Sequence, residues 1–460
     1  MPEKPQSTTD LVRDLGASHA TALVVGTIIG SGIFRVPGAM MLAVGSPKYV
    51  YLAWLVGGLL SFFGALSFAE LGAMRPQSGG EYVYIRDAYG PLPGFLYCWN
   101  WFVIAKPASI ATVVTGMVDA LSALPWFHFL SNAIFTYPFT LTWAQVVAIA
   151  AAVLISGLNY IGVKRAGEFQ LYFTILKVAM LVGISVVGFT YAAGSWSHFG
   201  TSAPARGGVT GFMVALVAAL WAYDGWNDLN MVGEEVRDPG KSIPIALIAG
   251  VAIVGVLYVL MNAAIQYVLP AADLARSKSP AAAMMLVVLG PAGAAVITVG
   301  IALSMLVTLN GTIMSGARIP FAVARDGYFF RKLAVVHPLF HTPGPAIVVQ
   351  LILSVLLLLA PADFLGFLGL AIFAEWLFYM ISTSTVFVFR RREPDAVRPY
   401  RTWGYPAVPA LFIMAAAILL VYTFAENLHE APVLTWLSVA FLAAGVPVFY
   451  FFKRRRKVGT

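Results

Sequence analysis

Apolar segments long enough to cross a lipid bilayer recur along the whole chain. A helix needs about 20 mostly apolar residues to span the hydrocarbon core, because its backbone polar groups have to bond one another there. The chain is 60% hydrophobic and 11% charged, with a mean hydropathy of +0.82, which excludes an ordinary soluble domain. We therefore predict an all-α polytopic membrane protein with twelve transmembrane helices. The candidate spans lie near residues 17–44, 50–74, 92–122, 142–160, 168–192, 211–235, 243–268, 284–317, 344–360, 363–389, 405–424 and 432–452.

The two ends of the chain indicate its orientation. The first sixteen residues, MPEKPQSTTDLVRDLG, lack the basic start and the small-residue cleavage site of a secretory signal, so we expect the first helix to be retained. With a cytoplasmic N-terminus, 22 of the 29 Lys and Arg residues fall on cytoplasmic segments, as the positive-inside rule requires. We expect a cytoplasmic N-terminus over 1–16, a single transporter domain over 17–452 and a basic cytoplasmic tail over 453–460, at the inner lipid headgroups. The net charge of +8 therefore reflects topology rather than nucleic-acid binding.

The spans fall into two blocks of similar length. Spans one to five cover about 17–192 and spans six to ten about 211–389, and the extra helices cover about 405–452. Because each block holds an odd number of spans, the second block has to be inverted relative to the first. The pattern predicts a 5+5 inverted repeat.

Spans one and six are both interrupted in their middle. The stretch GTIIGSGIF (26–34) places glycines in the first span, where each costs roughly 1 kcal/mol relative to alanine. The stretch LWAYDGWNDLN (220–230) places Gly, Asp and Asn in the sixth. Discontinuous helices at corresponding positions of two inverted halves indicate a transporter site at the membrane midplane. The alternative is that the glycines only allow a close helix contact.

The first break provides the groups that bind a zwitterion. A helix unwound at Gly30-Ser31-Gly32 frees carbonyl groups on one side and N–H groups on the other. We expect the N–H groups and Ser31 to hold an α-carboxylate. The carbonyls around Ile28 and Ile29, with those near Trp221 and Ala222, would hold an α-ammonium.

Five sequence motifs lie along nearly the whole chain. They are GTIIGSGIFRVPG (26–38), FAELGAMRPQSGGEYVYIRDAYGPLPGF (68–95), WAYDGWNDLNMVGEEVRDPGKSIPIA (221–246), NGTIMSGARIPFAVARDG (310–327) and HPLFHTPGPA (337–346). These motifs resemble those of the L-type amino acid transporter (LAT) family, within the amino acid, polyamine and organocation (APC) superfamily. The resemblance implies a twelve-helix fold with a 5+5 inverted repeat and discontinuous helices 1 and 6, and sodium-independent exchange of L-amino acids.

The resemblance also implies which residues meet the substrate. Residues 29–33 would clasp its backbone, and Trp221 would be the aromatic gate over the site. In animal members a cysteine between spans three and four is linked to a glycoprotein heavy chain; this chain has none there, so we expect no disulfide-linked heavy chain. The expected substrate-binding residues are Ile29, Gly30, Ser31, Gly32, Ile33, Trp221, Ala222, Asp224, Asn227, Asn310 and Trp376.

Lys177 lies in the middle of span five, where a charge is costly and has to be stabilised by polar groups of the protein. In sodium-coupled relatives of this fold a cation bridges the first break to span eight. The Lys177 ammonium is expected to take that place, donating to carbonyls near Gly26 to Ile29 and to Ser304 or Thr308. The alternative is that protonation of Lys177 couples transport to a pH gradient.

Other charges inside the spans have open assignments. Asp224 either recognises cationic side chains or pairs internally with Arg35, Lys106 or Trp and Tyr donors, and we favour the internal pairing. Arg35 is expected to face the outer vestibule, and Lys106 to be structural. Glu70 and Glu375 are possible partners of these cations, but the sequence does not assign the pairs.

The cytoplasmic end of span six carries Glu234, Glu235, Arg237 and Asp238. A salt-bridged inner gate and a solvated loop are both compatible with this pattern.

Signals of other function classes are missing from the sequence. It has no HExxH motif, no paired Cys and His spacing and no phosphate-binding loop, so we expect neither an enzyme nor a metal or other cofactor. The single cysteine, Cys98, excludes an intramolecular disulfide.

We therefore interpret the chain as a sodium-independent amino acid antiporter that works by alternating access in a bacterial inner membrane. Its expected substrates are neutral amino acids, with cationic ones possible. The main alternative is a proton-coupled amino acid or amine symporter. A channel is disfavoured because the spans carry isolated polar residues rather than a continuous polar lining. A sensor is disfavoured because it would normally carry a soluble output domain.

Overall fold

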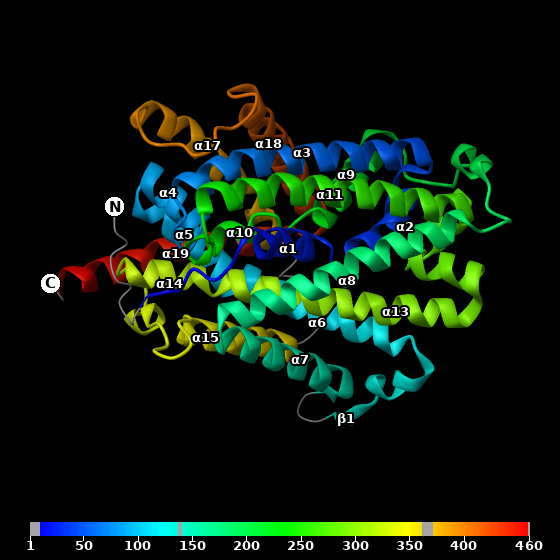
Figure 1. The fold of residues 1–460 in the computed structure, drawn as a ribbon, viewed down its shortest axis with the longest axis horizontal. Helices are drawn as coiled ribbons and strands as arrows, with labels where there is room; N and C mark the ends of the chain where they lie inside the picture. The colour runs from blue at the N-terminus through cyan, green and yellow to red at the C-terminus, as the bar shows by residue number, and fades with distance from the viewer. Residues whose placement is uncertain (1–9, 137–139, 361–370, 459–460) are drawn as a thin grey trace.

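The computed structural model describes residues 10–136, 140–360 and 371–458, and most of them are helical. Figure 1 shows long helices lying side by side along the long axis of the molecule. In the described chain, nine segments are long and apolar enough to span a membrane, and α9 and α15 are shorter apolar helices. The count of twelve spans and the inverted repeat stay predictions, and residues 363–370 of the predicted tenth span lie outside the described residues.

The elements of the first part of the chain include one π-helix and two short strands. They are α1 (Ala17–Ile28), α2 (Gly32–Val44), α3 (Pro47–Met74), α4 (Glu81–Tyr89), α5 (Pro91–Asn100), η1 (Trp101–Ala105), α6 (Lys106–Ser122), η2 (Pro125–Ser131), β1 (Ala133–Phe135), β2 (Leu141–Thr142), α7 (Trp143–Tyr160) and α8 (Val163–Phe189). The strands pair antiparallel in the connection between predicted spans three and four.

In the described residues of the second part of the chain, all of the helices and strands that form are helices. Its elements are η3 (Trp196–Gly200), α9 (Gly208–Ala222), α10 (Asp228–Met231), η4 (Gly233–Glu235), α11 (Pro239–Val268), α12 (Ala271–Arg276), α13 (Pro280–Gly316), α14 (Arg318–Arg325), η5 (Arg331–Ala334), α15 (Gly344–Leu358), α17 (Ala371–Arg392), α18 (Ala407–Glu430) and α19 (Pro432–Val458).

Both predicted breaks are present. Residues 29–31 separate α1 from α2, and residues 223–227 separate α9 from α10. Gly225 in the second break has φ +104°, a backbone conformation that favours glycine. At the start of α2, a Cβ on Gly32 would lie 2.9 Å from both the Cα and Cβ of Ala222. Glycine therefore allows the two breaks to approach each other.

Local sequence explains where other helices end and begin. Gly45 follows α2 in a left-handed conformation, with its N–H donating to the Met41 carbonyl. Thr142 and Gln145 form a reciprocal capping box at the start of α7.

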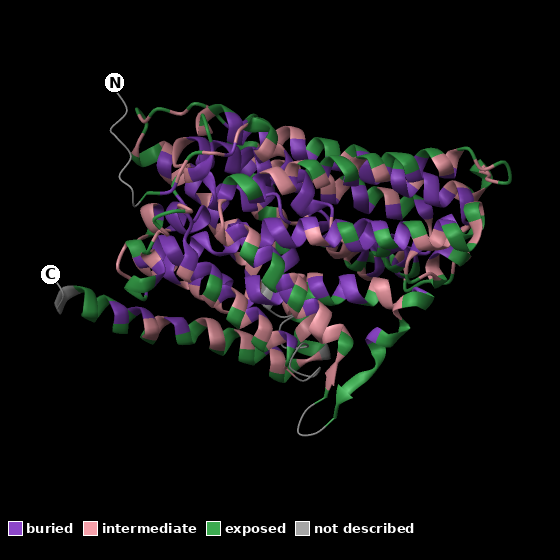
Figure 2. Cartoon of the chain, turned by 60° about the horizontal axis from the view of Figure 1, so that its bottom comes forward, coloured by how far each residue is buried: buried purple, intermediate pink, exposed green. Residues whose placement is uncertain are grey.

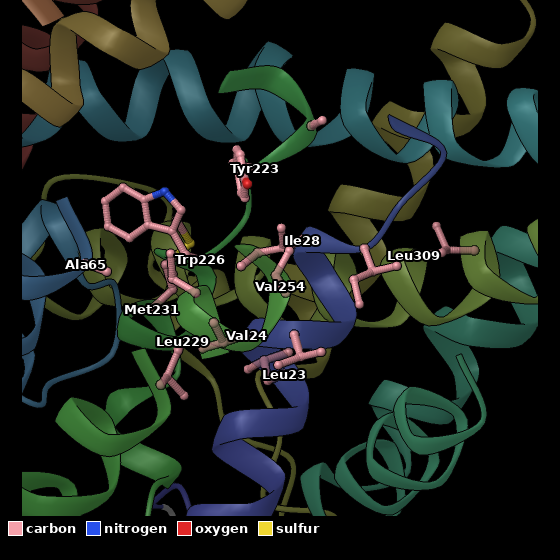
Figure 3. Packing of buried hydrophobic residues seen from close by; sticks show 14 of the residues in the cluster. Leu23, Val24, Ile28, Ala65, Tyr223, Trp226, Leu229, Met231, Val254 and Leu309 are labelled. Carbon is pink, nitrogen blue, oxygen red and sulfur yellow. The ribbon is translucent and has the colours of Figure 1, made fainter. Parts of the chain in front are cut away.

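The broken helices lie at the centre of the bundle. α1 packs against α8, α11 and α13, and α2 packs against α9. Figure 3 shows apolar side chains of α1, of the second break, of α11 and of α13 packing together here. They include Leu23, Val24, Ile28, Tyr223, Trp226, Val254 and Leu309.

Exposed residues are mostly on the outward faces of the helices, and buried ones fill the interior (Figure 2). Many exposed side chains are large and apolar, such as Leu55, Leu154 and Val256. A surface of this kind fits lipid contact rather than water.

Residues 10–16 pack against the bundle. Leu11 and Leu15 are 4% and 1% exposed, and Leu15 forms a parallel backbone bridge with Val236. Apolar burial and backbone hydrogen bonds together hold these residues against the helices.

Candidate functional site

A cavity of about 590 Å³ lies between the two breaks and the helices around them. Residues of α6, the start of α7, α13, the end of α15 and α17 complete its wall. The wall carries four carboxylates and two cationic side chains. They are Asp119, Asp224, Asp228 and Glu375, with Arg35 and Lys106.

The first break contributes Gly30, Ser31 and Gly32 to the cavity wall. Ile29 and Ile33 were also expected to contact the substrate, but both are fully buried and off the wall. The prediction for these two residues concerns their backbone groups and stays a prediction, while their apolar side chains turn into the helix bundle.

The second break contributes Trp221, Ala222 and Asp224. Trp221, the predicted gate, is 43% exposed. Such exposure is unusual for a tryptophan in the middle of a bundle, and it shows that part of the indole faces open space at the cavity.

Tyr258 of α11 joins the two breaks. Its hydroxyl oxygen lies 3.0 Å from the carbonyl oxygen of Ile28 and 2.9 Å from that of Ala222. These carbonyls were expected to hold the substrate ammonium. The Ile28 carbonyl also accepts the Gly30 N–H at 2.8 Å, so both lone pairs of that oxygen are engaged, whereas the Ala222 carbonyl keeps at most one further position for a ligand.

Lys177 makes the contacts expected from the sequence. Its ammonium donates to the carbonyls of Gly26 at 2.8 Å and Ile29 at 2.5 Å, and lies 3.3 Å from the Thr308 hydroxyl oxygen. Ser304 donates to the Ile29 carbonyl at 3.0 Å. Lys177 is only 3% exposed, so its charge is held by carbonyl dipoles and a hydroxyl instead of water.

Asn310 does not line the cavity, contrary to expectation. Its amide donates to the Ala166 carbonyl and to Gln170, and Asn159 donates to its carbonyl oxygen. On α13 the cavity is reached by Thr308 and Thr312 instead. Asn310 lies two residues from each, so it points to another side of the helix.

Trp376 is also off the cavity wall. It packs against Tyr379 and Phe412, and Glu375 reaches the cavity in its place. Neighbouring residues on a helix point about 100° apart. The residue of the tenth predicted span that reaches the cavity is therefore Glu375, one position before the expected Trp376.

Asn227 lies behind the wall instead of on it. It is 1% exposed, and its amide donates to the Glu81 carboxylate at 2.6 Å. The Tyr379 hydroxyl lies 3.1 Å from its carbonyl oxygen and 2.8 Å from an Asp224 carboxylate oxygen. Asn227 is therefore part of a polar cluster that supports Asp224. The contact with Tyr379 agrees with the internal pairing favoured for Asp224, while leaving Asp224 on the cavity.

The contacts give partners to two of the charged residues that the sequence left unassigned. Lys106 forms a buried ion pair with Asp228, which was not among the expected partners. Glu70 pairs with Arg390 at 2.7 Å, away from the cavity. Arg35 is exposed on the cavity wall, as expected for a vestibule residue.

Ion pairs join α14 to the end of the sixth predicted span. Arg318 and Glu235 are fully buried and share two hydrogen bonds of 2.8 and 2.9 Å. Arg325 pairs with Glu234 at 2.8 Å.

These contacts favour the salt-bridged alternative over a solvated loop. Arg237 completes the pattern by pairing with Asp14 of the N-terminal segment at 2.8 Å. Asp238 instead takes a left-handed backbone conformation before α11.

Sequence reasoning missed the part of the wall made by α6. Ser109, Thr112, Thr115 and Asp119 all line the cavity. Their spacing of three and four residues is the signal that could have found them, since it places them on one helix face. The π-helix η1 before α6 also contributes Trp101 and Ala105, and π-turns of this kind often mark functional sites.

The comparisons with known proteins agree with this architecture. The family model described as "Amino acid permease" matches residues 15–449. A serine/threonine exchanger of Bacillus subtilis (strain 168) is 34% identical over 455 residues, covering 97% of this chain and 98% of that protein.

Two human proteins are similar as well. The b(0,+)-type amino acid transporter 1 is 31% identical over 455 residues, covering 98% of this chain and 90% of that protein. The cystine/glutamate transporter is 31% identical over 449 residues, covering 97% and 86%. These relatives are membrane transporters and not enzymes. With its membrane-spanning helices, this chain is an integral plasma-membrane protein, and it belongs to the amino acid permease family.

Proposed function

We propose that this protein is a sodium-independent L-amino acid exchanger that works by alternating access. The observation that carries the proposal is the position of Lys177, whose ammonium joins the first break to α13. A sodium ion would be held by the same kinds of oxygen atoms. An ammonium in that position makes a coupling sodium ion unnecessary.

The substrate backbone binds at the two breaks in this proposal. The N–H groups at the start of α2 and the Ser31 hydroxyl hold the carboxylate, since a helix N-terminus favours anions. The carbonyls around Ile28 and Ala222 hold the ammonium, and the Ala222 oxygen keeps a lone pair for it beside the Tyr258 contact. Trp221 then closes over the substrate.

The proposed topology has twelve transmembrane helices in a 5+5 inverted repeat, over about 17–192 and 211–389, with extra helices over about 405–452. Both termini, 1–16 and 453–460, lie in the cytoplasm. The described residues near both termini lie at the same end of the bundle, which supports this arrangement (Figure 1).

The described conformation is outward-facing under this topology. The cavity wall reaches Asp119 near the end of α6 and Gln145 near the start of α7, which then lie on the outer side. On the opposite side, the Arg318–Glu235 and Arg325–Glu234 pairs hold the cytoplasmic ends of the helices together. Opening to the cytoplasm requires these pairs to separate.

The proposed setting is a bacterial inner membrane, with the protein acting without a disulfide-linked heavy chain. The similar serine/threonine exchanger is bacterial, and the connection between α6 and α7 holds no cysteine. The proposed substrates include neutral amino acids.

Uptake of radiolabelled serine, threonine and arginine into proteoliposomes in sodium-free buffer tests the proposal. Vesicles contain either unlabelled amino acid or none, with and without an imposed pH gradient. The exchanger is expected to take up label only against internal amino acid. Uptake into empty vesicles driven by the pH gradient would contradict it and favour the proton-coupled symporter, with Lys177 as the coupling residue.

A further inference from the structure

The helix α19, which ends at the label C, runs along the outside of the bundle (Figure 2). Its C-terminal half borders an apolar groove of about 480 Å³ that shares no lining residue with the substrate cavity. The groove lies between Trp99 of α5, Phe329 and Phe330 before η5, and Phe451 and Phe452 of α19. Phe330 and Phe451 are 56% and 48% exposed, so the groove is open at the surface.

Among the described residues, the side chains that line the groove offer no free hydrogen-bonding group. They are aromatic or aliphatic, and the indole N–H of Trp99 already donates to the Phe441 carbonyl at 2.9 Å. α19 packs closely on this wall at Gly445, where a Cβ would lie 2.8 Å from side-chain atoms of Trp99 and Leu96. The groove therefore suits an apolar chain, because a polar group there would lose its hydrogen bonds to water.

Six exposed cationic residues directly follow the groove walls in sequence. Arg331 and Lys332 come after Phe330, and residues 453–456, KRRR, come after Phe452. In the described parts of the chain, none of the six forms an ion pair. The positive-inside rule accounts for cations at a cytoplasmic end, but it does not account for an open apolar groove beside them.

Two of these cations, Arg455 and Arg456, lie at the C-terminal end of the groove. They come four residues after Phe451 and Phe452, which places them one turn further on the same face of α19. The Arg455 guanidinium lies over the Phe451 ring, 4.5 Å from its centroid, and the Arg456 guanidinium lies over the Tyr328 ring at 4.7 Å. A guanidinium stacked on a ring leaves the N–H donors at its edge available, so both can bind a phosphate.

We propose that this groove is a binding site for an anionic phospholipid, with an acyl chain in the groove and the phosphate on Arg455 and Arg456. Under the proposed topology both arginines lie at the cytoplasmic headgroups, so the lipid belongs to the inner leaflet. The acyl chain covers the exposed aromatic walls, and the phosphate neutralises cations that have no partner in the described chain.

The cations argue against a second copy of this chain as the occupant. A symmetric dimer through α19 would place the same basic segments of two copies next to each other. Like charges in contact oppose association, whereas a phosphate removes the repulsion. The groove and its cations together therefore fit a lipid and not a second α19.

Lipid binding to the purified, delipidated protein tests the site, measured by native mass spectrometry. Phosphatidylglycerol is compared with phosphatidylethanolamine of the same acyl chains, which has no net charge, and with glycerol 3-phosphate, which has no chains. Wild-type protein is expected to bind phosphatidylglycerol about tenfold more tightly than phosphatidylethanolamine. Glycerol 3-phosphate should not displace the lipid at equal concentration.

Removing the two charges should weaken phosphatidylglycerol binding by about tenfold, since each cation near the headgroups attracts the anionic lipid. The charge variant is Arg455→Gln/Arg456→Gln. Its matched control is Lys164→Gln/Arg165→Gln, at an exposed basic pair at the start of α8, which should bind the lipid as wild-type protein does.

Shortening the walls should weaken binding of the same lipid by about tenfold as well, because less apolar surface meets the acyl chain. The wall variant is Phe330→Ala/Phe451→Ala. Its matched control is Val433→Ala/Leu437→Ala, at exposed positions near the start of α19, which should keep wild-type affinity. Size-exclusion chromatography checks that every variant is folded.

Three results on lipid binding would overturn the site. They are equal affinity of the wild-type protein for the two lipids, wild-type affinity in the charge variant or the wall variant, and an equal loss in either control. A dimer that forms on delipidation and is lost in the wall variant would assign the groove to a second copy instead. Because binding is measured without transport, failure of this site leaves the exchange function unaffected.

Discussion

The ammonium of Lys177 on α8 lies 2.5 Å from the carbonyl oxygen of Ile29, at the point where α1 ends. The same carbonyl accepts a hydrogen bond from Ser304 of α13. One backbone oxygen at the first break is thus tied to two neighbouring helices. If residues 29–31 move relative to α8 or α13, the hydrogen bonds from Lys177 and Ser304 are lost, unless those side chains move with them.

Replacing Lys177 should impair transport without unfolding the protein. Lys177→Ala removes the ammonium and leaves the carbonyls of Gly26 and Ile29 short of donors, so we expect exchange to fall by about tenfold or more. The measurement is the exchange rate per folded molecule, with folding checked by size-exclusion chromatography. Lys164→Ala, an exposed position on the same helix, is the control and should exchange normally. Normal exchange in Lys177→Ala over the whole pH range would remove Lys177 from the mechanism.

A larger side chain at Gly32 should prevent substrate binding. A Cβ there would lie 2.9 Å from Ala222, so Gly32→Val has to push the two breaks apart. We expect at least about a hundredfold loss of affinity, measured by substrate-dependent thermal stabilisation of the purified protein. Gly183→Val is the matched control, because Gly183 is exposed on α8 and faces open space. Wild-type affinity in Gly32→Val would refute the assignment of the break as the backbone-binding site.

Truncating the gate should slow turnover more than it destabilises the fold. Trp221 is 43% exposed, so Trp221→Ala removes little packing. We expect the maximal exchange rate to fall by about tenfold while the unfolding temperature changes by only a few degrees. Trp436→Ala, at an exposed tryptophan of α19, should change neither quantity. Unaltered exchange in Trp221→Ala would show that this indole is not a gate.

Removing one partner of the buried Arg318–Glu235 ion pair should destabilise the protein strongly. Arg318→Met leaves Glu235 buried without its partner, which typically costs about 3–5 kcal/mol. The unfolding temperature in detergent should fall clearly, and the double variant Arg318→Met/Glu235→Met should recover part of the loss. Arg325→Met, at a more exposed pair, should cost much less. A double variant no more stable than Arg318→Met would show that the two charges are not coupled.

Much of the site could be predicted because backbone chemistry leaves local signals. Glycines in the middle of an apolar run located the first break, and Gly225 with its polar neighbours located the second. Lys177 was equally informative, since a lone charge between apolar residues needs acceptors and the nearest free carbonyls are at a break.

Side-chain direction could not be predicted in the same way. Trp376 and Asn310 lie on the correct helices but face away from the cavity, because the rotation of a helix depends on packing with its neighbours. The partner of Lys106 was missed for a related reason. Asp228 is 122 positions away in sequence, and only the approach of α6 to the second break brings it into contact.

The most direct test of the account is the stoichiometry of exchange in sodium-free proteoliposomes. Vesicles are loaded with ¹⁴C-labelled serine and placed in ³H-labelled serine, and efflux and uptake are measured in the same sample. The account predicts one molecule out for each molecule in, no efflux into buffer without amino acid and no effect of added sodium. Net uptake without efflux, or uptake that requires sodium, would contradict it.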